Sequence, residues 1–139
     1  MKNKISTVAV VGAGAVGSYF GGLLARAGHV VTLIARNEHV KAIQENGLYM
    51  ECQSFQEHVL VKASTQYEAI AEADLILFCV NSPDTESVAK EIKPYLSEDS
   101  IILSLQNGVD NCERIKTVLS NPTYPAVVYV ATGVAGPGH

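Results

Sequence analysis

The stretch VAVVGAGAVGSYF, residues 8–20, decides the fold of this chain. Its first four residues are apolar, as in a strand buried in a parallel sheet, and the spacing after the glycines is typical of a helix. Gly12, Gly14 and Gly17 form the pattern G-x-G-x-x-G at the junction. Such glycines allow a tight turn, a pyrophosphate lying against the backbone, and close contact between helix and sheet, while the helix N-terminus adds unpaired N–H donors. This order predicts a dinucleotide site; the alternative is a glycine-rich helix packed tightly on a sheet. The predicted cofactor contacts in this turn are Gly12, Ala13, Gly14, Ala15, Val16 and Gly17.

Glycines also lie inside the predicted helix, where each costs about 1 kcal/mol relative to alanine. Gly17 and Gly21 are four residues apart and share a face, so close packing on the sheet explains that pair. Gly12 and Gly14 precede the helix, and the sequence offers no packing reason for them. They are therefore the better evidence for a ligand.

The composition indicates a single globular domain. The chain has 139 residues, of which 47% are hydrophobic and 17% charged, so it is long and apolar enough to bury a core. A net charge of −4 without a lysine or arginine cluster argues against nucleic-acid binding. Cys52, Cys79 and Cys112 are scattered without metal-ligand spacing, and they fit reduced thiols. His39, His58 and His139 lack a partner at useful spacing, so the sequence assigns them no role, and no metal site is expected.

The N-terminal residues resemble a secretory signal, because basic residues precede an apolar run in residues 1–16. The same residues serve more economically as the first strand and its glycine turn. No apolar run is long enough for a membrane helix. We therefore expect a cytoplasmic protein that does not bind membranes.

The rest of the chain alternates between predicted strands and helices, which favours a doubly wound parallel sheet of the α/β class with strand order 3-2-1-4-5-6. The six apolar residues 75–80 indicate a strand buried on both faces. Residues 48–61 are the least regular region. Further strands are predicted over 29–34, 59–62, 101–105 and 126–131, and helices over 14–27, 37–45, 67–73, 82–93 (Ser82 as N-cap, Pro94 ending it) and 110–119.

Arg36 decides which cofactor the sequence favours. Sites specific for NAD usually carry an acid at the tip of the second strand, but here Ala35-Arg36-Asn37 stands there and the first acid is Glu38. A guanidinium suits the 2′-phosphate of NADP, because its planar fork donates two charge-assisted hydrogen bonds. Such bonds contribute about 1.5–3 kcal/mol each. The alternative is a solvated arginine at a strand end.

Two other strand ends belong to the same predicted crevice, since ligands bind beyond the carboxyl ends of the strands. Asn81 follows the strand over 75–80, and Gln106-Asn107-Gly108 follows the strand over 101–105. The Asn107 amide has both donors and an acceptor, suited to a ribose hydroxyl or to a substrate oxygen near the nicotinamide. The alternative is a plain Asn-Gly turn.

At these residues the chain resembles the N-terminal domain of the ketopantoate reductase (2-dehydropantoate 2-reductase) family. The resemblance covers nearly the whole chain and is carried by residues 10–17, Arg36, residues 74–80, Gln106-Asn107-Gly108 and Gly136-Pro137-Gly138-His139. It implies reduction of a small 2-keto acid with NADPH, in the central case ketopantoate to pantoate on the route to pantothenate. Arg36 would bind the 2′-phosphate, and Asn107 would lie by the nicotinamide and the substrate.

The chain departs from the family pattern at Asn81, where the family usually has lysine. Losing that charge weakens the preference for NADP over NAD. The resemblance also implies that the general-acid lysine belongs to a helical C-terminal domain absent from residues 1–139, so we expect no catalytic residue in this chain. The oligomeric state stays open. Alternatives are the cofactor domain of another two-domain hydroxyacid dehydrogenase, or a stand-alone nucleotide-sensing module; Arg36 counts against both.

Overall fold

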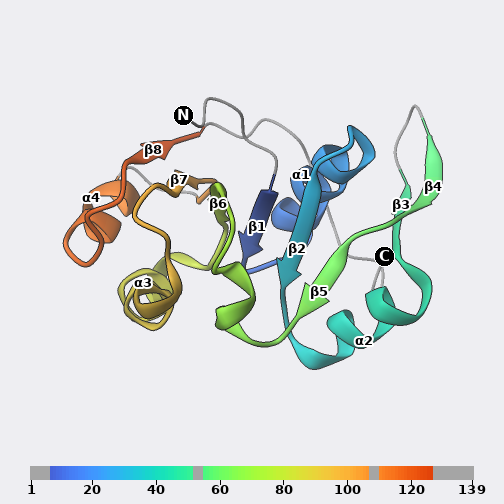
Figure 1. Cartoon of the computed structure of the whole chain (residues 1–139), viewed down its shortest axis with the longest axis horizontal. Coiled ribbons are helices and arrows are strands. Elements are labelled where there is room, and N and C mark those ends of the chain that lie inside the picture. The colour runs from blue at the N-terminus through green and yellow to red at the C-terminus, as the bar shows by residue number, and fades with distance from the viewer. Residues whose placement is uncertain (1–6, 52–54, 107–109, 127–139) are drawn as a thin grey trace.

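Six parallel strands form one sheet in the part of the chain that the computed structural model describes, residues 7–51, 55–106 and 110–126 (Figure 1). Counted among themselves in chain order, the parallel strands follow the predicted order 3-2-1-4-5-6, so the doubly wound fold is confirmed. From one edge to the other they are β5 (Lys62–Ser64), β2 (Val30–Ile34), β1 (Thr7–Val11), β6 (Leu75–Phe78), β7 (Ile101–Ser104) and β8 (Thr123–Pro125).

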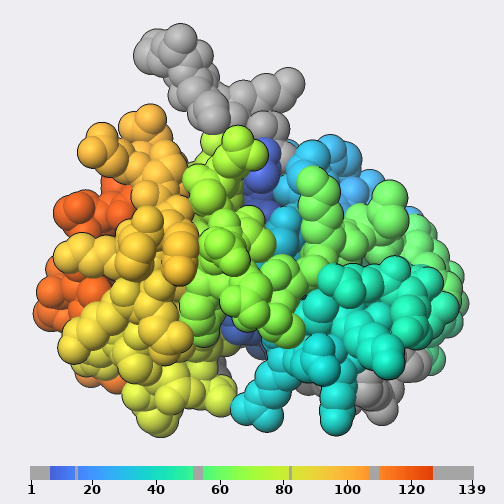
Figure 2. Space-filling model, turned by 60° about the horizontal axis from the view of Figure 1, so that its bottom comes forward, coloured from blue at the N-terminus to red at the C-terminus, as the bar shows by residue number. Residues whose placement is uncertain are grey.

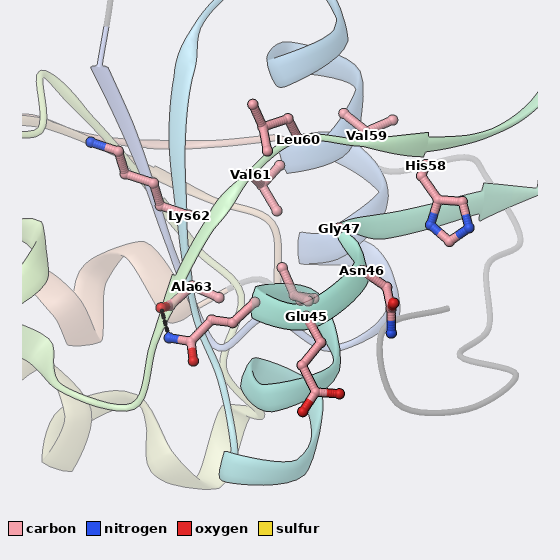
Figure 3. A pocket seen from close by; sticks show the side chains of 11 residues that line it. Glu45, Asn46, Gly47, His58, Val59, Leu60, Val61, Lys62 and Ala63 are labelled. Carbon is pink, nitrogen blue, oxygen red and sulfur yellow. Dashed lines mark hydrogen bonds between the residues drawn. The ribbon is translucent and has the colours of Figure 1, made fainter.

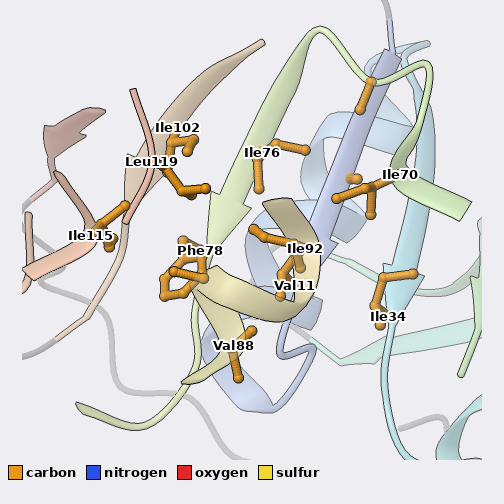
Figure 4. Close-up of a cluster of buried hydrophobic side chains, with 13 residues drawn as sticks. Val11, Ile34, Ile70, Ile76, Phe78, Val88, Ile92, Ile102, Ile115 and Leu119 are labelled. Carbon is orange, nitrogen blue, oxygen red and sulfur yellow. The ribbon is translucent and has the colours of Figure 1, made fainter. Parts of the chain in front are cut away.

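Helices cover both faces of this sheet because its central strands are apolar on both sides. On β1, Val8 and Val10 belong to one core and Ala9 and Val11 to the other. Figure 4 shows the second of these cores, where Phe78 is fully buried beneath the third α-helix. The described α-helices are α1 (Ala15–Arg26), α2 (Asn37–Asn46), α3 (Thr85–Ile92) and α4 (Asn111–Lys116). Short 3₁₀ helices also occur: η1 (Tyr67–Ile70) between β5 and β6, η2 (Ser82–Asp84) just before α3, and η3 (Lys93–Tyr95) just after it.

The irregular region contains an antiparallel hairpin of β3 (Leu48–Glu51) and β4 (Gln56–Val59). The sequence predicts the third parallel strand over 59–62, and this is wrong: Val59 pairs with Leu48 in the hairpin, and the parallel strand β5 begins at Lys62. Two β-prone segments lie close together there, and propensity does not reveal which partner each one takes.

Several element ends also differ from the prediction. The last described strand, β8, covers Thr123–Pro125, just before the strand predicted over 126–131, and residues 127–131 of that prediction lie outside the described part. The helix predicted over 82–93 starts as η2, and Asp84 rather than Ser82 precedes α3. Pro94 lies within η3, because proline fits the first turn of a helix. Among the described helices, none combines the length and the apolar character that crossing a membrane requires.

Candidate functional site

Gly12 ends β1 in a conformation that favours glycine. Its φ is +85°, and a Cβ added there would lie 2.9 Å from the backbone nitrogen of Val80. The structure therefore shows a packing reason for Gly12 that the sequence does not reveal, namely the Val80 backbone beside it. The Ala13 N–H donates to the Ile34 carbonyl over 2.9 Å, which joins the turn to the end of β2.

Gly14 marks the open part of the turn. Among the described residues, none would lie within 4 Å of a Cβ built on it. Helix α1 starts at the next residue, with no acid in its first turn, and no side chain of the described residues caps its N-terminus. An uncapped helix N-terminus presents N–H groups and a partial positive charge to an anion. Room beside Gly14 and free donors next to it are what a diphosphate needs.

Gly17 and Gly21 let α1 lie against the sheet, as the sequence predicts. A Cβ on Gly17 would approach Cγ1 of Val10 to 2.7 Å, and one on Gly21 would approach Cδ2 of Leu33 to 2.8 Å. A Cβ on Gly22 would collide with the Met50 thioether of β3. The N-terminus of α1 is thereby held directly over the end of β1.

Arg36 lies at the same edge of the sheet as the glycine turn. Strands β1 and β2 are parallel, with Val11 opposite Ile34, so their carboxyl ends coincide. The exposed Arg36 precedes α2 in an extended conformation, and its carbonyl accepts from the Val40 N–H over 3.0 Å. Just before it, the Ala35 N–H donates to the Ser64 carbonyl over 3.2 Å. Figure 2 shows the molecule turned toward this edge, with a notch between the cyan start of α2 and the yellow α3.

Asn81 also lies at this edge. Strand β6 is parallel to β1, with Phe78 opposite Val11, and Asn81 follows it as an exposed residue. Its carbonyl accepts from the Asp84 N–H over 2.9 Å. Asn107, predicted to contact both cofactor and substrate, lies outside the described residues, as do the Gly136-Pro137-Gly138-His139 residues.

A buried polar network behind this edge was not predicted from the sequence. The Gln106 side-chain amide donates to the Val80 carbonyl over 3.0 Å and to the Thr85 hydroxyl over 2.8 Å. Ser104 donates to the Gln106 side-chain oxygen over 3.0 Å, and Thr85 donates to Asn111 over 3.2 Å. The network therefore joins the ends of β6 and β7 to α3 and α4. The sequence signal for this network is that Thr85 and Asn111 are polar residues at helix positions where the pattern otherwise places buried apolar residues.

An ion pair extends this network toward solvent. Arg114 on α4 donates to the two carboxylate oxygens of Glu86 on α3, over 2.6 and 3.0 Å. Hydrogen bonding to Arg114 lowers the pKa of the Glu86 carboxyl. Both side chains are partly exposed, so solvent screens the pair and it adds little to stability.

His39 has a partner that the sequence does not reveal. Its Nε2 lies 3.2 Å from the Ser18 hydroxyl, which is 3.3 Å from the Ala13 carbonyl. Ser18 is buried, and burial lowers the pKa of the His39 imidazole. The sequence assigns His39 no role for want of a partner at useful spacing; in the structure the partner comes from another helix, 21 residues away in sequence.

An open hollow of about 570 Å³ lies between the end of α2 and the segment from His58 to Ala63 (Figure 3). Gln44 closes one side by donating to the Ala63 carbonyl over 3.0 Å. The hollow shares no residue with the glycine turn. It therefore adds nothing to the site at the carboxyl edge.

Doubly wound sheets bind dinucleotides where the strand order reverses, and the glycine turn follows β1 at that reversal. By fold and site, the chain is a Rossmann-type dinucleotide-binding domain. A sequence profile of the ketopantoate reductase PanE/ApbA family matches residues 8–139. The chain belongs to this family, which uses a nicotinamide cofactor, and it represents the dinucleotide-binding part.

Solved and curated relatives agree with this assignment. A PanE/ApbA family ketopantoate reductase from Ralstonia eutropha superposes with a TM-score of 0.94 at 56% identity, over 96% of this chain and 45% of that chain. The 2-dehydropantoate 2-reductase of Pyrococcus horikoshii is 39% identical over 81% of this chain and 36% of its own length. A D-mandelate dehydrogenase with NADH and anilino(oxo)acetate has a TM-score of 0.84 at 28% identity, over 95% of this chain and 44% of that chain. The chain thus spans less than half the length of these relatives.

Proposed function

We propose that this chain is the NADPH-binding domain of an oxidoreductase that reduces a small 2-keto acid, ketopantoate to pantoate. The observation that carries the proposal is the position of Arg36 at the same edge of the sheet as the glycine turn. One group recognises a diphosphate and the other a phosphorylated ribose. Their combination on adjacent strands suits NADPH.

The diphosphate would lie against the turn from Gly12 to Gly17. No described residue takes up the space beside Gly14, and the first-turn N–H groups of α1 would donate to the diphosphate. Because that turn contains no acid, no like charge opposes the phosphates. Ala13, Ala15 and Val16 contribute backbone rather than side-chain chemistry.

Arg36 would select NADPH over NADH. Arg36 is exposed among the described residues, so its guanidinium can turn toward a 2′-phosphate, and the nearest acid in sequence, Glu38, lies in the first turn of α2. Asn81 supplies a hydrogen-bonding amide without a charge, so the preference is weaker than with lysine there. The D-mandelate dehydrogenase that carries NADH makes NADH the second candidate cofactor.

When bound, the nicotinamide supplies the hydride. This chain's own part is to bind and orient, with the Asn107 amide holding a ribose hydroxyl or a substrate oxygen. The family resemblance assigns the general-acid lysine to a further domain, and the relatives extend well beyond the matched part. We therefore assign no catalytic residue to this chain, and we propose a cytoplasmic enzyme for the whole protein.

Calorimetry with NADPH and NADH tests the proposal on the chain as it stands. Arg36→Ala should weaken NADPH binding by about 10- to 100-fold, the loss of one or two charge-assisted bonds, and leave NADH unchanged. Arg26→Ala is the matched control, because Arg26 lies at the other end of α1 and pairs with Glu57 over 3.1 Å. Equal affinity for both cofactors, unchanged by Arg36→Ala, would refute the selection of NADPH.

A further inference from the structure

His39 links the two halves of the cofactor site through Ser18. Its Nε2 contacts the Ser18 hydroxyl over 3.2 Å, and that hydroxyl donates to the Ala13 carbonyl over 3.3 Å. The Ala13 N–H donates in turn to the Ile34 carbonyl over 2.9 Å. The glycine turn is therefore tied on one side to the end of β2 and on the other to α2.

The number of hydrogens on each group indicates which group donates and which accepts in these hydrogen bonds. A serine hydroxyl has one hydrogen, and Ser18 uses it toward the Ala13 carbonyl. His39 must then donate from Nε2 to the Ser18 oxygen, which requires the tautomer protonated at Nε2. A side chain that offers an N–H at that position could take over the contact, whereas alanine could not.

The first turn of α2 carries both His39 and the backbone of Arg36. Arg36 immediately precedes α2, and its carbonyl accepts from the Val40 N–H, so it moves with that turn. Holding His39 against Ser18 therefore holds the Arg36 backbone at a set distance from the N-terminus of α1. Ser18 is only 7% exposed, which leaves this contact little freedom.

We propose that His39 is a positioning residue for cofactor selection: it sets the spacing between the diphosphate-binding turn and Arg36. This inference rests on the proposed NADPH-binding function. A planar guanidinium binds a phosphate well only when both of its donors are aimed correctly. His39 therefore acts on the 2′-phosphate through Arg36, and NADH, which lacks that phosphate, does not depend on it.

The test compares the dissociation constants of NADPH and NADH in variants of the full chain. His39→Ala should raise the constant for NADPH about three- to tenfold, the loss typical of one hydrogen bond, while the constant for NADH changes less than twofold. His39→Gln, whose amide can donate to Ser18, should restore most of the difference. His58→Ala is the control, because His58 is exposed on β4 and contacts the ring of Tyr49. Ser18→Ala, which removes the acceptor, should reproduce His39→Ala by an independent change.

A double variant separates this inference from the proposed function. If His39 acts through Arg36, His39→Ala should not alter the NADPH-to-NADH ratio further in an Arg36→Ala background. An equal loss for both cofactors, a loss that persists in that background, or no rescue by His39→Gln would each overturn the positioning role alone. A ratio untouched by Arg36→Ala itself would overturn the proposed NADPH selection, and the role of His39 with it.

Discussion

At the scale of single residues, we expect Gly12 to matter for the stability of the fold and Gly14 for cofactor binding. Gly12 has a positive φ and the Val80 backbone against it, whereas none of the described residues lies against Gly14. Gly12→Ala should lower the free energy of unfolding by about 1–3 kcal/mol through strain. Gly14→Ala should leave stability within about 0.5 kcal/mol, yet weaken both NADPH and NADH about tenfold or more by filling the place of the diphosphate. Urea unfolding and calorimetry measure the two effects. Unimpaired cofactor binding by Gly14→Ala would mean that the diphosphate does not lie there.

The His39 imidazole gives the fold a dependence on pH. Burial lowers its pKa from the ordinary value of 6.5, so the unfolded chain takes up the proton at a higher pH than the folded chain does. The stability that neutral His39 contributes is complete above about pH 6.5 and is lost as pH falls from there toward the lowered pKa. His39→Gln lacks this titration. The difference in unfolding free energy between the wild-type chain and the variant should therefore shift against the wild type below about pH 6.5. A difference that moves the other way on acidification would contradict the lowered pKa.

At the scale of secondary-structure elements, the Gln106 network holds the ends of β6 and β7 to α3. Thr85 is fully buried and bonds both Gln106 and Asn111. Thr85→Val keeps the shape but leaves those two groups without this partner, so it should cost about 1–3 kcal/mol in urea unfolding. Thr117→Val is the matched control, since Thr117 is exposed at the end of α4 and bonds the Arg114 carbonyl. Equal losses of unfolding free energy in the two variants would show that the network does not stabilise the attachment of β6 and β7 to α3.

Elements with strong local signals were predictable, and those defined by tertiary contacts were not. Helix α1 was predictable because its spacing and Gly28, which has a φ of +104°, mark its end. In the hairpin of β3 and β4, Met50 packs against Gly22 of α1, a contact between distant residues that periodicity does not encode. The contact between His39 and Ser18 was missed for the same reason. The glycine turn and Arg36 were predictable because the conformational freedom of glycine and the charge of arginine follow directly from the residue type.

At the scale of the whole molecule, the sheet order was predictable because right-handed crossovers leave few topologies for alternating strands and helices. That order brings the glycine turn, Arg36 and Asn81 to one edge, although these residues are up to 69 positions apart, from 12 to 81. The sequence could predict which strand ends meet, but not the distances between side chains. Those distances decide how strongly each cofactor binds.

The whole domain should therefore bind the cofactor without completing the reaction. NADPH at 100 times its dissociation constant should stabilise the folded chain by about 2.7 kcal/mol, seen as a rise in the unfolding midpoint. Ketopantoate added to the loaded chain should cause little or no loss of NADPH absorbance, because we assign the proton donor to the part of the relatives that this chain does not cover. Gly14→Ala, which should fold but bind weakly, is the control for the thermal shift. Sustained NADPH oxidation by the chain alone would require a proton donor within residues 1–139 and would overturn this division, whereas a missing thermal shift would count against cofactor binding itself.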